Sequence, residues 1–182
     1  DHNFGVEVDV RIINKKLILN HEPFQKALPL DTFLKKFNHK FLILNVKEEG
    51  IENLILNYVK KNNIKNYFLL DVTVPKIFQF IKNKKKNNLC LRISKFEKLN
   101  QLNFFNKKIE WIWVDTFDNK IPLNVNDLEG YSKKFKLCLV SPELVKTNNI
   151  DVTKFIKINK YKLNFFSAVC SKNIKTWEKY GY

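Results

Sequence analysis

Residues 5–10 of the chain, Gly5-Val6-Glu7-Val8-Asp9-Val10, form the first of seven short runs that are rich in apolar, β-forming residues. Most of these runs are almost continuously apolar, which is typical of strands buried on both faces of a parallel sheet. Each run therefore predicts a strand. The other six runs are residues 41–46, 67–72, 89–93, 111–116, 137–141 and 165–171.

The segments between the runs predict helices, because their apolar residues recur at helical spacing. Residues 50–62 and 74–82 are the clearest examples, and another helix is expected to begin near Leu123. Strands that alternate with helices predict a parallel sheet with right-handed crossovers. The apolar positions of the first two helices are Ile51, Leu54, Ile55, Tyr58 and Val59, then Ile77, Phe78 and Ile81.

The glycine content bears on the type of α/β fold. The chain has only 4 glycines, and no Gly-x-Gly-x-x-Gly follows any run, so the dinucleotide-binding signature is absent. We therefore expect a (β/α)8 barrel of the TIM type, with seven of its eight units present. The chain contains no methionine, so we expect the first strand to lie upstream and residues 1–182 to form one N-terminally incomplete barrel domain.

The bulk composition limits the class of protein. Hydrophobic residues make up 45% of the chain, which excludes a disordered polypeptide, and no apolar run approaches the roughly 18 residues that span a bilayer. The net charge of +15 could indicate a basic nucleic-acid or anionic-membrane binder. Only Arg11 and Arg92 among the 33 basic residues are arginines, so we expect no specific nucleic-acid partner.

The three cysteines, Cys90, Cys138 and Cys170, each lie in an apolar run, and none has CxxC spacing. This context predicts buried free thiols in a reducing compartment, and hence a cytoplasmic location.

Polar residues end most of the predicted strands. In a barrel of parallel strands the carboxyl ends meet at one face, which is where active sites lie. We therefore expect these side chains to surround a site. They are Asp9, Asn45 with Lys47, Asp71, Arg92, Asp115, Ser141 and Ser171.

Glu7 and Asp9 lie two residues apart on a predicted strand, so their side chains point to the same face. Two carboxylates there suit a hard divalent cation, Mg²⁺ or Ca²⁺. A polar turn at residues 14–16 and a second apolar strand then lead to His21, which we expect to fold back toward the carboxylates. Carboxylates with a histidine suit metal-assisted acid–base chemistry on a phosphate ester.

These residues resemble the pattern of the glycerophosphodiester phosphodiesterase family. That pattern reads Gly-x-x-Glu-x-Asp-Val, a short insertion, and then apolar residues before His-Asp, and residues 5–10 and 17–23 are similar to it. Weaker similarities continue along the chain. They are Leu44-Asn45-Val46-Lys47 with the apolar-x-Glu-x-Lys strand, residues 111–115 with a strand that carries a tryptophan near the site, and residues 168–171 with the closing strand.

The resemblance implies metal-dependent hydrolysis of glycerophosphodiesters, in glycerophospholipid metabolism, on a barrel of the phospholipase C-like superfamily. It implies that Glu7 and Asp9 bind the metal, that His21 is the general acid or base, and that Lys47 balances phosphate charge. We expect the substrate-binding residues to be Asn45, Asp71, Arg92, Trp113 and Asp115, with Trp113 contacting a glycerol or lipid-derived group.

Three differences from the family pattern leave other functions open. No His-Arg strand is present, Asn45 stands at the position of a third carboxylate ligand, and Glu22 follows His21 where the family has aspartate. One alternative is therefore a catalytically weak or inactive barrel that binds a phosphorylated ligand. The other is the basic nucleic-acid or anionic-membrane binder considered above.

Overall fold

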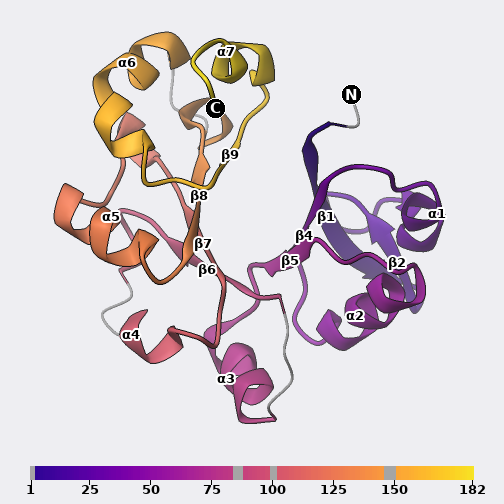
Figure 1. Ribbon diagram of the computed structural model, residues 1–182. Helices are drawn as coiled ribbons and strands as arrows, with labels where there is room; N and C mark the ends of the chain where they lie inside the picture. The colour runs from indigo at the N-terminus through magenta and orange to yellow at the C-terminus, as the bar shows by residue number, and fades with distance from the viewer. Residues whose placement is uncertain (1–2, 84–87, 99–101, 146–150) are drawn as a thin grey trace. The chain divides into compact units, whose positions relative to one another are not determined.

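A computed structural model describes residues 3–83, 88–98, 102–145 and 151–182. The chain divides into two compact units, residues 1–90 and 91–182, and each is described by itself (Figure 1). In the described part of the chain, no helix combines the length and the apolar character that crossing a bilayer requires.

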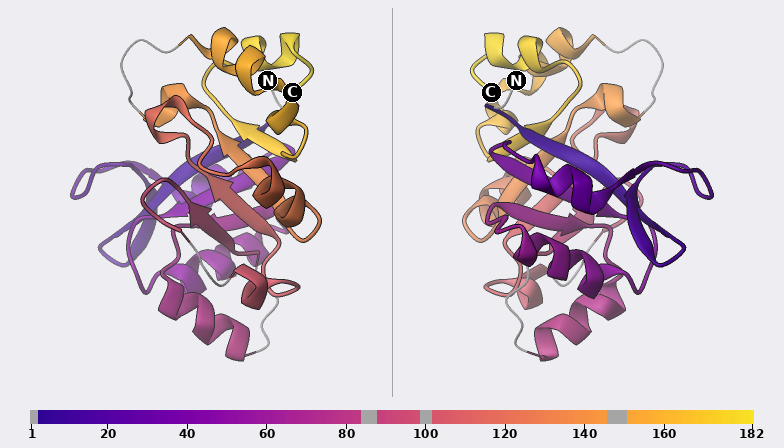
Figure 2. Two further views of the ribbon diagram at one scale, coloured as in Figure 1. Left: turned by 90° about the vertical axis from the view of Figure 1, so that its left-hand side faces the viewer. Right: turned by 90° about the vertical axis from the view of Figure 1, so that its right-hand side faces the viewer.

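The first unit is built on a five-stranded mixed sheet of order β3-β2-β1-β4-β5. Its parallel part joins β1 to β4 and β4 to β5, whereas β1 pairs antiparallel with β2 and β2 antiparallel with β3. The β1–β2 hairpin, in indigo, can be followed in the right-hand view of Figure 2. The strands are β1 (Gly5–Ile13), β2 (Lys16–Leu19), β3 (Leu28–Pro29), β4 (Phe41–Val46) and β5 (Tyr67–Leu70).

Three helices complete the first unit: α1 (Leu30–Lys35), α2 (Glu52–Lys61) and α3 (Val74–Lys82). The buried residues of the first unit include apolar side chains of β4, β5, α2 and α3. Leu44, Leu69, Ile55 and Ile77 are all fully shielded from solvent. Burial of a side chain of this size contributes roughly 1.5–3 kcal/mol relative to an exposed position.

The second unit has a four-stranded sheet of order β6-β7-β8-β9, in which β7, β8 and β9 run parallel. All four residues of β7 are buried, as expected for a strand covered on both faces. The elements are β6 (Cys90–Ile93), α4 (Leu102–Phe105), β7 (Trp111–Val114), η1 (Phe117–Asn119), α5 (Val125–Ser132), β8 (Lys136–Val140), η2 (Pro142–Val145), α6 (Val152–Leu163), β9 (Ala168–Cys170) and α7 (Ile174–Lys179).

The local predictions agree with these elements. Each of the seven apolar runs contains a strand, and α2, α3 and α5 lie in the segments that predict helices. The polar turn is also confirmed, since Asn14 and Lys15 have φ values of 49° and 64° between β1 and β2. Two left-handed residues in succession are typical of a tight hairpin turn. Cys90 and Cys138 are buried as expected, and Cys170 is half-buried.

The predicted (β/α)8 barrel with seven units is wrong. The structure contains two sheets, one mixed and five-stranded and the other four-stranded. Among the described residues, β5 meets the residues just before β6 at an isolated bridge between Leu69 and Leu89, not at a continuous ladder. Beyond β1, strands β2 and β3 continue the sheet in antiparallel pairing, whereas a (β/α)8 barrel has parallel strands throughout. A single domain over residues 1–182 stays a prediction.

Candidate functional site

The candidate site lies in the first unit where the parallel pairing of β1 with β4 ends, beside the carboxyl end of β5. Glu7 and Asp9 come from β1, Asn45 from β4, Lys47 directly follows β4, and Asp71 directly follows β5. Asp9 is in register with Asn45 across the parallel ladder. Register neighbours in a sheet project to the same face, so the pairing brings these polar side chains together. The expected convergence of Glu7, Asp9, Asn45 and Lys47 is therefore observed.

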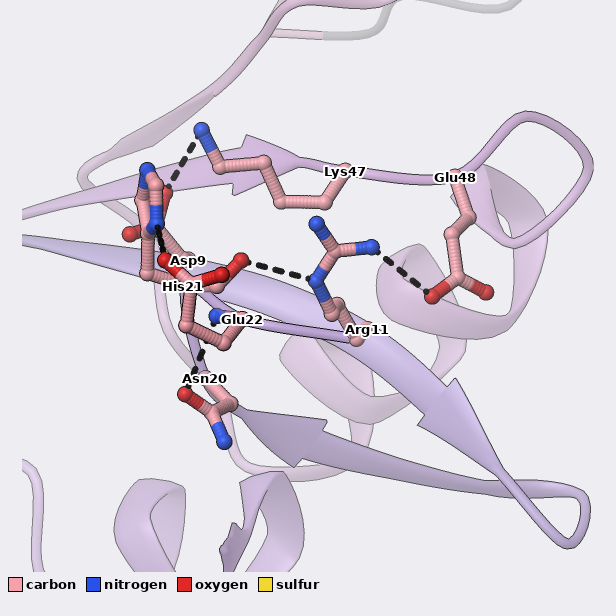
Figure 3. A network of polar contacts seen from close by, with 7 residues as sticks. All are labelled: Asp9, Arg11, Asn20, His21, Glu22, Lys47 and Glu48. Carbon is pink, nitrogen blue, oxygen red and sulfur yellow. Dashed lines mark hydrogen bonds and ion pairs between the residues drawn. The ribbon is translucent and has the colours of Figure 1, made fainter. Parts of the chain in front are cut away.

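Each carboxylate on β1 has a protein partner on the β4 side. Lys47 Nζ lies 3.0 Å from Asp9 Oδ1, and both side chains are about four-fifths buried (Figure 3). The Asn45 amide donates a hydrogen bond to the Glu7 carboxylate. Among the described residues, the buried Asn45 Oδ1 accepts no hydrogen bond, whereas Asp9 Oδ1 has the Lys47 ammonium beside it. An unsatisfied buried oxygen is costly unless a cation or water completes it.

The electrostatics of the cluster favour an added positive charge. Burial of Glu7 is the largest cause that raises the pKa of its carboxyl, and the negative charge of Asp9 raises it further. The hydrogen bond from Asn45 and the charge of Lys47 lower this pKa, whereas the charge of Asp71 raises it. The sum of these effects is a raised pKa. Proton uptake by Glu7 is thus easier than usual, first because its carboxyl is buried and second because Asp9 and Asp71 add negative charge nearby.

Asp71 has a left-handed backbone, with φ of 60°. Asp and Asn tolerate this conformation better than most residues, yet it still costs free energy in a non-glycine residue. The strained turn places a carboxylate within electrostatic range of Glu7 immediately after β5. Strained residues of this kind often occur at functional sites.

The donor set fits a hard divalent cation. Glu7, Asp9 and Asp71 carry three negative charges when ionised and Lys47 carries one positive charge, which leaves a net charge of −2. In the described part of the chain, no three His, Cys, Asp or Glu side chains are arranged to hold a metal by themselves. Mg²⁺ is commonly held by one or two carboxylates with water and substrate phosphate as its other ligands. Glu7, Asp9 and the Asn45 oxygen could supply such a partial set.

His21 lies on the loop after β2, and the backbone of β1 holds the start of this loop. Asn20 N donates to Asp9 O over 3.1 Å, and Arg11 Nε donates to His21 O over 3.0 Å (Figure 3). Arg11 is itself held by Glu48, with Nη1 3.3 Å from Oε1. The histidine is therefore tethered beside the middle of β1, although its side chain is 70% exposed. Sequence reasoning missed the role of Arg11, which could have been suspected from its position two residues after Asp9.

Three other predicted site residues form a separate cluster in the second unit. Trp113 Nε1 donates to Asp115 Oδ1 over 3.1 Å, and Arg92 forms an ion pair with Asp115 Oδ2. Asp115 is 2% exposed, and both of its oxygens are engaged by these partners. The arrangement has the character of a structural network. A substrate-binding role for Arg92, Trp113 and Asp115 stays a prediction.

Ser141 and Ser171, which end later predicted strands, both form hydrogen bonds with Glu143. Glu143, which sequence reasoning missed, accepts hydrogen bonds from Ser141 Oγ and from Ser171 Oγ. Trp177 Nε1 donates to Ser141 Oγ over 3.0 Å, so the fully buried hydroxyl of Ser141 both donates and accepts a hydrogen bond.

No protein-family model matches this chain, and no match to it is found among curated proteins.

Proposed function

We propose that the chain hydrolyses glycerophosphodiesters to glycerol phosphate and an alcohol, as enzymes of the glycerophosphodiester phosphodiesterase family do, with Mg²⁺ or Ca²⁺ held by Glu7 and Asp9. The observation that carries the proposal is the buried Asn45 Oδ1, which accepts no hydrogen bond and lies in a cluster with the carboxylates of Glu7 and Asp9. A hard cation would satisfy this oxygen and offset the negative charge of the carboxylates. The substrate class comes from the resemblance of residues 5–23 to that family.

The cation, when bound, would polarise a phosphoryl oxygen of the diester. Lys47 has a second role, because its side chain is 20% exposed and its ammonium group contacts the carboxylate cluster at Asp9. A positive charge there offsets the negative charge of an incoming phosphodiester, which Glu7 and Asp9 would otherwise repel. Lys47 therefore keeps the cluster able to accept an anionic substrate.

His21 suits proton transfer to or from the ester oxygen. Its Nδ1 lies 2.9 Å from Glu22 Oε1, and an ionised carboxylate can only accept a hydrogen bond. The Nδ1 proton is thus committed to Glu22, which leaves Nε2 to accept a proton as a base or to donate one after protonation. Positioned acid–base groups of this kind contribute about 10²–10⁴-fold to rate.

The test is turnover of glycerophosphocholine by the full chain with Mg²⁺ or Ca²⁺, measured as released choline and glycerol phosphate. We expect turnover to require the cation and to fall by about 10²-fold or more in Glu7→Gln and in His21→Ala. Glu110→Gln is the matched control, since Glu110 is about half-exposed and pairs with Lys136 outside the cluster. Unchanged turnover in both cluster variants would contradict the proposal.

A second candidate function is binding of a phosphorylated ligand without turnover. Asn45 favours it, because a neutral amide that donates to Glu7 is a weaker cation ligand than a carboxylate. Saturable binding of glycerophosphocholine, seen by calorimetry, together with no released choline at any cation concentration would favour this function over hydrolysis.

A further inference from the structure

Helix α6 carries an exposed face that the fold of its unit does not use. Lys154, Lys157, Ile158 and Tyr161 follow the spacing i, i+3, i+4, i+7, so they lie within an arc of about 100° on one side of the helix. We call these four residues the α6 patch. All four are exposed, and Ile158 and Tyr161 are 71% and 65% exposed.

The opposite face of α6 holds the helix in the second unit. Val152, Phe155, Ile156 and Leu163 are buried, and the Phe155 ring lies 6.4 Å from the Trp177 ring. Asp151 caps the first turn by accepting a hydrogen bond from Lys154 N over 3.1 Å. The helix is thus fixed by its cap and its inner face, and the patch is free to contact a partner.

The α6 patch is strongly basic. The helix reads VTKFIKINKYKL and contains no acidic residue, while Lys160 adds a further exposed positive charge beside the patch. In the described ranges of the chain, no carboxylate forms an ion pair with Lys154, Lys157 or Lys160. Acidic residues three or four positions away on a helix can pair with lysines, and α6 contains none. The charge is therefore available to an anionic surface.

The apolar part of the patch lies between the lysines. Ile158 and Tyr161 are adjacent on the surface, and the Tyr161 ring meets the Phe165 ring edge to face at 5.7 Å. A helix with lysines around exposed aliphatic and aromatic side chains is typical of segments that lie in a membrane interface. A nucleic acid would gain nothing from Ile158, and phosphate readers usually employ arginine, which α6 lacks.

We propose that the α6 patch docks the chain onto an anionic phospholipid surface, with the lysines against the headgroups and Ile158 and Tyr161 at the boundary of the acyl chains. This inference rests on the second unit alone and does not depend on hydrolysis at Glu7 and Asp9. In this proposal, the lysines of α6 are the part of the chain's positive charge that contacts the membrane.

The test is sedimentation of the full chain with phosphatidylcholine vesicles that contain or lack phosphatidylserine. We expect binding only to the vesicles with phosphatidylserine. Lys154→Ala with Lys157→Ala should weaken it by about 25-fold, since each lysine near an anionic surface contributes about fivefold. Lys36→Ala with Lys65→Ala is the control of equal charge change, because both lysines are exposed in the first unit, and it should bind like the wild type.

A second pair of substitutions tests whether Ile158 and Tyr161 contribute to vesicle binding. Ile158→Ser with Tyr161→Ser should weaken binding even in about 1 M salt, where the Debye length of about 3 Å screens the lysine contribution. Phe24→Ser, which changes an exposed ring outside α6, should bind like the wild type. Equal binding to neutral vesicles, equal loss in the control variants, or binding to duplex DNA without binding to vesicles would each overturn the proposal.

Discussion

Replacement of Glu7 by glutamine should make the metal-free chain more stable at neutral pH. The carboxylate of Glu7 is mostly buried beside Asp9, and its pKa is raised by burial and by the charge of Asp9. Glutamine keeps the shape and can still pair with the amide of Asn45, but it removes the negative charge. The variant should therefore lose function and gain stability, which is the trade-off expected at a functional site.

The magnitude follows from the strand geometry. Side chains two residues apart on a strand are separated by about 6.6 Å, and two unit charges at that distance repel by about 2.5 kcal/mol at an effective dielectric constant of about 20. Lys47 offsets part of this repulsion through its contact with Asp9. We therefore expect Glu7→Gln to raise the free energy of unfolding by about 1–2 kcal/mol at pH 7.

The direction of the pKa shift determines how the contribution of Glu7 to stability changes with pH. Because the pKa of Glu7 is raised above its ordinary value of 4.5, the folded chain keeps a proton where the unfolded chain has lost it. The contribution of Glu7 to stability is thus fully present below 4.5 and is lost as the pH rises through the folded pKa. Each unit of the increase corresponds to about 1.4 kcal/mol at neutral pH.

Urea unfolding of wild type, Glu7→Gln and Glu110→Gln across this pH range measures the effect. The advantage of Glu7→Gln over wild type should grow from near zero below 4.5 to its full size at pH 7, and Glu110→Gln should follow the wild type. A Glu7→Gln chain that is less stable than wild type at pH 7, or whose difference does not vary with pH, would refute the reasoning.

Three further predictions concern single contacts. Asn45→Asp should bind Mg²⁺ about tenfold more tightly by calorimetry, because it adds a carboxylate, and should unfold more easily without the cation. Arg11→Ala removes the tether on the backbone of His21, so kcat for glycerophosphocholine should fall roughly tenfold with stability changed by about 1 kcal/mol. Asp115→Ala removes the acceptor of Trp113 Nε1 from a buried network, so urea unfolding should show a loss of about 2–4 kcal/mol.

The sequence predicts the strands and the hairpin because their signals are local. Residues 41–46 and 111–116 are apolar enough to require burial on both faces, and two polar residues at positions 14 and 15 suffice for a tight turn. The position of Asp9 beside Asn45 also follows from local signals, since both lie near the end of the stretch over which β1 and β4 pair in parallel. Glu7, Asp9, Asn45 and Lys47 could accordingly be grouped before the structure was known.

The closure of the sheet could not be predicted in the same way, because it depends on hydrogen bonds between strands that are distant in sequence. Strand β3 is only two residues long, contains Pro29 and is exposed, so no apolar pattern signals that it extends the sheet beyond β2. The contact between Arg11 and the backbone of His21 depends on the β1–β2 register. The strand-end pattern likewise could not show that Asp115 is saturated by Trp113 and Arg92.

Calorimetric titration of Mg²⁺ and of Ca²⁺ into the full chain tests the central claim most directly. The cluster of Glu7, Asp9 and Asn45 predicts one bound cation per chain, with binding lost in Glu7→Gln and in Asp9→Asn and retained in Glu110→Gln. Absence of binding in the wild type, or binding that is equal in Glu7→Gln and wild type, would contradict the account.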